Sequence, residues 1–137
     1  MQFSKTAQYA IRTLSYLYRY SEKPHSVNTI HKELNLPYKY ITKLMTELVK
    51  QGLVKSTRGR DGGFTLEKDA SEIMLCDIFE AIGEPLEDDQ CILGFEKCNA
   101  KNPCALHNKW DEPNQMIQSI FTTATLESLF IDQNLKL

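Results

Sequence analysis

The fold of this chain can be read from residues 37–64, whose sequence is PYKYITKLMTELVKQGLVKSTRGRDGGF. Apolar side chains recur in its first half at positions i, i+3, i+4, i+7 and i+8, namely Ile41, Leu44, Met45, Leu48 and Val49. This spacing predicts an amphipathic helix with one buried face. Pro37, which tolerates the missing N–H of a helix start, and Gly52, which suits a left-handed helix end, mark its limits.

The opposite face of this predicted helix is polar and partly cationic. It carries Lys39, Tyr40, Thr42, Lys43, Thr46, Glu47 and Lys50. Side chains of these types contact phosphates and base edges in the major groove of duplex DNA. The candidate DNA-reading residues are Lys39, Tyr40, Thr42 and Lys43.

A short basic hairpin is predicted directly after that helix. Residues 53–57 have the pattern of a strand, residues 58–63 form a glycine-rich turn, and residues 64–66 form the returning strand. The turn carries Arg58, Gly59 and Arg60, which are the candidate contacts to the adjacent minor groove or its phosphates.

A second short helix is predicted upstream of the polar helix. Ser26 has the residue type of an N-cap, residues 27–34 are long enough for a helix, and residues 35–37 form a turn. Two helices joined by a short turn and followed by a basic hairpin indicate a winged helix-turn-helix. We expect His25 and His31, which have no ligand-like spacing to a partner, at the surface or at a helix cap.

Charge is divided unevenly along the chain. Residues 1–68 hold twelve Lys and Arg against five Asp and Glu, a balance of +7, and residues 69–137 hold four against thirteen, a balance of −9. These balances sum to the formal net charge of −2. The basic half can release counterions from a phosphate backbone while the acidic half stays away from it, which favours DNA as the partner.

Length and composition indicate one globular, mainly α-helical protein. Its 137 residues, 42% hydrophobic and 25% charged, suit a winged helix-turn-helix domain over residues 1–83, a cysteine-bearing loop over 84–107, and a dimerisation helix with its tail over 108–137. No run of about 18 apolar residues and no signal-peptide core is present, so we expect a cytoplasmic protein without a membrane partner. No catalytic constellation is recognisable, so we expect neither an enzyme nor a small-molecule substrate.

The loop carries four candidate metal ligands. Cys91, Cys98 and Cys104 are separated by six and five residues, and His107 follows Cys104 by three positions. In a cytoplasmic protein this cluster favours a metal site over disulfides. Three thiolates and an imidazole suit either zinc or an iron–sulfur cluster, although the wide gaps favour the cluster. Cys76 lies inside a predicted helix and is expected to be a packed side chain.

The chain is predicted to end in a further amphipathic helix. Its apolar stripe consists of Met116, Ile117, Ile120, Phe121 and Ala124. Pro113 lacks a backbone donor, so we expect the helix to be kinked or re-initiated there. DNA-reading domains commonly bind paired half-sites, so this helix favours a symmetric homodimer.

Several stretches resemble the Rrf2 family of bacterial winged-helix regulators. They are Tyr9-Ala10, residues 52–56 with Arg58-Gly59, the segment Gly62-Gly63-Phe64, and residues 68–73. The resemblance covers nearly the whole chain, and the double glycine of the wing is its most specific part. It implies a homodimeric transcription factor whose dimer rests on a long carboxy-terminal helix.

Within that family the loop is similar to the cluster-binding, IscR/NsrR-like branch. The run from Cys104 to Trp110 resembles a C-x-x-H-x-x-W segment in which three cysteines and one histidine hold a 2Fe-2S cluster. In other members a carboxylate from the partner's first helix completes a 4Fe-4S site. The matching position here is Gln8, a poor ligand, so the resemblance favours His107 as fourth ligand.

The expected function is a repressor or dual regulator that binds promoter DNA and is gated by the cluster. The cluster would sense redox, iron–sulfur or nitric oxide status, with 2Fe-2S favoured and 4Fe-4S possible. Two alternatives stay open: a zinc-stabilised winged-helix module that binds protein, and a cofactor-free, thiol-based regulator. Thr42 stands where cluster-binding relatives carry an acid, so the operator sequence should differ from theirs.

Overall fold

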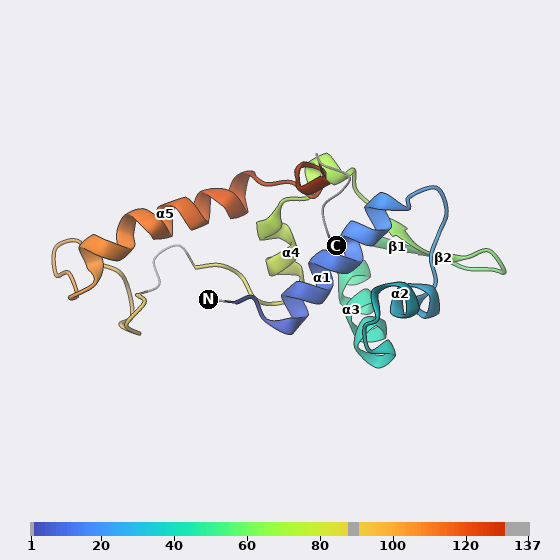
Figure 1. Ribbon diagram of the computed structural model, residues 1–137, viewed down its shortest axis with the longest axis horizontal. Helices are drawn as coiled ribbons and strands as arrows, with labels where there is room; N and C mark the ends of the chain where they lie inside the picture. Colours follow the sequence, from blue (N-terminus) through green and yellow to red (C-terminus); the bar gives the residue numbers. More distant parts are fainter. Residues whose placement is uncertain (1, 88–90, 131–137) are drawn as a thin grey trace.

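The computed structural model describes residues 2–87 and 91–130 (Figure 1). In chain order its elements are α1 (Lys5–Arg19), α2 (Val27–Leu34), α3 (Tyr38–Lys50), β1 (Val54–Thr57), β2 (Gly63–Leu66), η1 (Ala70–Glu72), α4 (Leu75–Ala81), α5 (His107–Thr123) and η2 (Ser128–Phe130). This mainly helical architecture with one antiparallel hairpin confirms the predicted fold class. Within the described residues, no helix combines the length and apolar character needed to cross a membrane.

The core forms where the apolar faces of α1, α2 and α3 meet. The buried side chains are Ala7, Ala10, Leu14, Leu17, Ile30, Leu34, Ile41, Met45 and Leu48. Full burial of one leucine or isoleucine contributes about 1.5–3 kcal/mol, so this shared apolar contact is the main interaction that holds the three helices together. Val49, predicted to join the buried stripe, lies at its margin and is 36% exposed.

Local hydrogen bonds close the turn between α2 and α3. The Ser26 side chain accepts the first-turn N–H of Thr29, which confirms the predicted N-cap. Asn35 ends α2 in the left-handed conformation, with φ of 52°. The Nδ1 of His31 then bonds the carbonyl oxygen of Leu36 at 2.6 Å. His31 is therefore the capping residue that the sequence predicts.

The wing is the antiparallel hairpin of β1 and β2. Its register runs from Val54 opposite Leu66 to Thr57 opposite Gly63. Val54, at the inner end, is buried, whereas the outer end of the hairpin projects beyond the helices in Figure 1. The projecting end carries the turn between β1 and β2.

His25 joins the wing to the helical core. His25 and Phe64 exchange two backbone hydrogen bonds, of 3.1 and 2.8 Å, as in a sheet. The imidazole Nε2 lies 2.7 Å from the carbonyl oxygen of Tyr20, and the residue is only 6% exposed. The predicted surface position of His25 is wrong, because this pairing joins segments about 40 residues apart and buries the side chain. The bond to Tyr20, the C-cap residue of α1, agrees with the alternative prediction of a capping residue.

The end of α5 is fixed to α4 by aromatic side chains. Phe121 is buried, with its ring centroid 5.0 Å from that of Phe79. Phe3 completes the cluster, at 5.1 Å from Phe79 and 5.6 Å from Phe121. The N–H of Leu75 also donates to the carbonyl of Ala124 at 3.0 Å. From this attachment α5 extends away from the core (Figure 1).

Pro113 lies inside a single continuous α5. The predicted re-initiation of the helix at this proline is therefore wrong. A proline in a helix interior removes one hydrogen bond at a cost of about 3 kcal/mol, yet the remaining bonds of this 17-residue helix are enough to carry it through. The predicted carboxy-terminal tail beyond residue 130 lies outside the described residues.

Candidate DNA-binding surface and candidate metal centre

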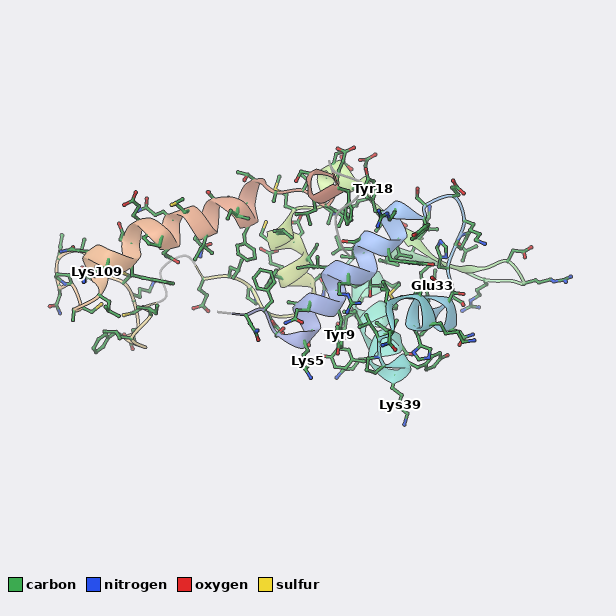
Figure 2. The ribbon with its side chains drawn as sticks, in the orientation of Figure 1. Lys5, Tyr9, Tyr18, Glu33, Lys39 and Lys109 are labelled. Carbon is green, nitrogen blue, oxygen red and sulfur yellow. The ribbon has the colours of Figure 1, made fainter. Side chains whose placement is uncertain are left out.

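Three predicted DNA-reading side chains lie on the exposed face of α3, which we call the recognition helix. Lys39, Thr42 and Lys43 are all exposed. Figure 2 shows Lys39 pointing away from the protein at the same lower edge of the view as Lys5 of α1. Lys5 of α1 therefore adds a positive charge on the side of the molecule where the recognition helix is exposed.

The Thr42 hydroxyl has its proton already engaged. Its Oγ1 donates to the carbonyl oxygen of Tyr38 at 3.0 Å, one turn earlier in the helix. In this rotamer the oxygen retains lone pairs but no free donor. Thr42 can therefore accept a hydrogen bond from the amino group of adenine or cytosine, as a base-reading acceptor does.

Tyr40 is held against α1. Its hydroxyl forms a short hydrogen bond with Thr6, and its ring packs edge-on against Tyr9 with centroids 5.1 Å apart. Tyr40 is still 37% exposed. The structure thus ties this predicted DNA-reading residue to the first two turns of α1 and leaves part of its ring at the surface.

Glycines shape the tip of the wing. Gly59 has φ of +113°, which a side chain would strain, and its carbonyl accepts the N–H of Gly62 at 3.2 Å. A Cβ at Gly62 would lie 2.1 Å from the carbonyl oxygen of Thr57. Arg58 and Arg60 flank Gly59, and both are exposed. The tight turn therefore presents two guanidinium groups at the tip.

The four predicted metal ligands come together as two pairs. The sulfurs of Cys91 and Cys104 lie 4.0 Å apart, and the sulfur of Cys98 lies 3.1 Å from Nδ1 of His107. All three cysteines line one cavity of about 430 Å³. Figure 1 shows this loop beside the start of α5, at the opposite end of the molecule from the wing.

The cysteines differ in acidity. Backbone N–H groups, first that of Leu93, hold the pKa of the Cys91 thiol below its usual value. Burial, reinforced by the charge of Asp77, raises the pKa of Cys76. A lowered pKa favours the thiolate that binds metals, so Cys91 suits a ligand and Cys76 suits the packed position predicted for it.

The pairwise arrangement bears on which metal group fits. Within residues 2–87 and 91–130, no three Cys, His, Asp or Glu side chains converge closely enough to hold one ion. Two ligands of the same tetrahedral metal lie roughly 3.5–3.8 Å apart, which falls between the 4.0 Å of the Cys91–Cys104 pair and the 3.1 Å of the Cys98–His107 pair. Two such pairs fit a group with two metal positions better than a single zinc ion.

Three residues near the recognition helix escaped prediction from the sequence. Lys5 lies on the same side of the molecule as the recognition helix. Thr6 forms a hydrogen bond with Tyr40, and Glu84 accepts hydrogen bonds from Ser4. For Lys5, the one signal in the sequence was a basic residue at the start of a predicted helix. The other two act through contacts across 34 and 80 residues of chain, which no local pattern reports.

Comparison with known proteins agrees with this arrangement. Residues 3–132 match the family model described as Rrf2, iron-dependent transcriptional regulator. An HTH-type transcriptional regulator of Aquifex aeolicus is 37% identical over 131 residues, which covers 94% of this chain and 91% of that protein. The HTH-type transcriptional regulator IscR of Photorhabdus laumondii is 29% identical over 134 residues, with coverage of 97% and 81%.

Solved structures share the fold over nearly their whole length. CymR, the global cysteine regulator of B. subtilis, superposes with a TM-score of 0.78 at 25% identity, covering 94% of this chain and 95% of CymR. IscR of T. potens superposes with a TM-score of 0.75 at 22% identity, with coverage of 100% and 93%. From its sequence match and its fold, this chain belongs to the Rrf2 family of DNA-binding transcriptional regulators.

Proposed function

We propose that this regulator binds promoter DNA as a homodimer and that an iron–sulfur cluster held by its cysteine loop gates the binding. The observation that carries the proposal is the meeting of four ligands in two pairs around Cys91 and Cys98. Family membership supports the DNA-binding half, and the matched family is described as iron-dependent. Action on a promoter would take place in the bacterial cytoplasm.

The DNA contacts divide by chemistry. Lys39, Thr42 and Lys43 of the recognition helix would enter the major groove, with Thr42 accepting from a base and the lysines reaching bases or phosphates. Tyr40 would offer its exposed ring edge while α1 holds its hydroxyl. In the wing, Arg58, Gly59 and Arg60 would approach the minor groove, where guanidinium groups suit the negative potential.

The cluster would be ligated by the three loop cysteines and by the imidazole that opens α5. The ligands are Cys91, Cys98, Cys104 and His107, with 2Fe-2S favoured by the two pairs and 4Fe-4S as the other nuclearity. When bound, such a group supplies one-electron redox chemistry and reactivity toward oxygen and nitric oxide. Through these ligands the cluster would connect Cys91 to the start of α5. Loss of the cluster would remove this connection and change the conformation of the loop.

The homodimer would be built on α5. Met116 is 63% exposed and Ile120, one turn later, is 55% exposed, so the pair forms an apolar strip on the outer face. Leu106, 39% exposed just before the helix, extends the apolar surface toward the cysteine loop. A second copy of the helix would cover this strip and place two recognition helices on paired half-sites.

A thiol-based switch without a cofactor is the second candidate function. It is favoured by the separation of 4.0 Å between the sulfurs of Cys91 and Cys104. A shift of about 2 Å would bring them to the length of a disulfide, with a cellular disulfide as the oxidant that accepts the two electrons. A solved neighbour described as a global cysteine regulator shares the fold.

Anaerobic native mass spectrometry with visible absorption separates these functions. We expect a dimer that carries iron and sulfide in equal numbers, with absorption lost in Cys91→Ser, Cys98→Ser and Cys104→Ser. Cys76→Ser is the matched control and should keep the cluster, because Cys76 is a packed side chain of α4.

The binding to DNA is then compared between cluster-loaded and cluster-free protein by fluorescence anisotropy. A ratio of affinities of about 5 or more is the usual scale of coupling between two sites. A colourless protein with one zinc per chain would contradict the iron–sulfur cluster and support a zinc-stabilised winged-helix module. Normal operator binding by a protein that contains neither iron nor sulfide would exclude gating by the cluster and favour the thiol-based switch.

A further inference from the structure

Glu84 joins the end of α4 to the start of α1. Its backbone N–H donates to the carbonyl of Phe79 at 2.9 Å, behind Gly83, whose φ of +75° ends the helix. Its carboxylate oxygens accept the Ser4 hydroxyl at 2.8 and 2.7 Å. The residue is half-buried and is the first of the cysteine-bearing segment 84–107.

The carboxylate supplies α1 with a charge that its own sequence lacks. The first turn of α1 contains no acidic residue. Ser4 is its N-cap and accepts the N–H of Ala7 at 3.0 Å while its hydroxyl donates to Glu84. A negative charge at a helix N-terminus stabilises the helix, and a charge-assisted bond to the cap residue holds it in place.

The same turn of α1 holds the recognition helix. Thr6, two residues after the cap, binds the hydroxyl of Tyr40, and Tyr9 packs on the same ring. Thr6, Tyr40 and Glu84 line one hollow of about 230 Å³, whose other walls include Leu44. The contact between Glu84 and α1 therefore lies beside the contact between α1 and Tyr40 of α3.

We propose that Glu84 is a positioning residue for DNA binding, through which the state of the cysteine loop reaches the recognition helix. The two-state element is the bond between Ser4 and Glu84, made in one state and broken in the other. When it is made, the first turn of α1 is held and keeps Tyr40 in place. This inference rests on the proposed gating of DNA binding by the loop.

The test uses Glu84→Gln, which keeps an oxygen that can accept the Ser4 hydroxyl but removes the charge that strengthens the bond. The control is Glu80→Gln, the same change at an exposed carboxylate one turn earlier. Operator affinity is measured by anisotropy for each protein, cluster-loaded and cluster-free. The wild-type ratio of the two affinities, about 5 or more, should fall to about 2 or less in Glu84→Gln and stay unchanged in Glu80→Gln. Iron and sulfide content and dimer mass are expected to stay as in the wild type.

If Glu84 had a purely structural role, its substitution would weaken DNA binding equally in the cluster-loaded and cluster-free forms. Equal weakening of both forms in Glu84→Gln, with the wild-type ratio preserved, would overturn the inference. Thr6→Val, which removes the hydroxyl that binds Tyr40, is expected to lower the ratio as well. The double variant is expected to lower it no further than either single change, because both interrupt one route.

Hydrogen exchange on the cluster-free protein provides a readout that does not depend on gating. Glu84→Gln is expected to raise amide exchange at Ala7 and Gln8 of α1 and at Ile41 of the recognition helix, whose N–H groups are the first in each helix to be hydrogen-bonded. Faster exchange in α1 alone would overturn the link to Tyr40. If wild-type affinities proved equal with and without the cluster, the gating in the proposed function would fail, and this exchange pattern would still decide the positioning role.

Discussion

The backbone of Gly63 passes so close to that of His25 that a Cβ on Gly63 would lie 2.6 Å from the His25 carbonyl carbon. The two segments touch because Phe64 and His25 pair through backbone hydrogen bonds. A side chain at Gly63 must therefore push the wing off the helical core. Breaking this pairing also frees the turn end of β2, where Gly63 pairs with Thr57.

We expect Gly63→Ala to lower the free energy of unfolding by about 2 kcal/mol or more, because it adds a backbone clash to the strain of its φ of +154°. Gly52→Ala is the control: φ is +76° there, and a Cβ would meet nothing within 4 Å. It should cost about 1 kcal/mol. Denaturant unfolding measures both, and equal losses would contradict the role of the His25 contact.

Removal of single cations should weaken DNA binding in a salt-dependent way. Lys43→Ala and Arg58→Ala each remove an exposed positive charge from the proposed DNA face. For each phosphate that is no longer neutralised, the slope of log affinity against log salt should become shallower by about 0.9. Fluorescence anisotropy over a range of salt concentrations measures the slope. Lys109→Ala, at the far end of the molecule in Figure 2, should leave it unchanged.

Cysteine reactivity in the cluster-free protein should follow the pKa directions. The thiolate is the form that reacts with iodoacetamide. Burial raises the pKa of Cys76, so its thiolate fraction stays low until the pH exceeds the ordinary value for cysteine. Backbone N–H groups lower the pKa of Cys91, so its alkylation should begin at lower pH. Peptide mass spectrometry across pH 6 to about 10 gives both curves, and faster labelling of Cys76 at neutral pH would contradict the assignment.

The outer strip of α5 should set the oligomeric state. Ile120→Glu introduces a charge into the apolar strip, so burial of that strip in a dimer would leave an unpaired carboxylate. We expect dissociation to monomers, measured by light scattering. Thr122→Glu, an equally charged change at an exposed position outside the strip, should leave the dimer intact. A dimeric Ile120→Glu protein would place the interface elsewhere.

Local patterns were enough to predict the elements of the DNA-binding half. The N-cap at Ser26, the stripe from Ile41 to Leu48 and the turn formed by Gly59 and Gly62 each depend on a few residues of chain. Helix caps, helical periodicity and tight turns are properties of short segments, so they can be read from sequence. The same holds for the ligand types of the cysteine loop.

Tertiary contacts decided what those patterns leave open. His25 is buried because a distant strand pairs with it. The grouping of the loop ligands into two pairs, the anchoring of Tyr40 on α1 and the bond between Ser4 and Glu84 all depend on how separate elements pack. The amino-acid sequence by itself therefore determined which residues are candidates to contact DNA and to bind metal. Only the folded chain decided which of them meet, because contacts between residues far apart in the chain form when apolar faces are buried against one another.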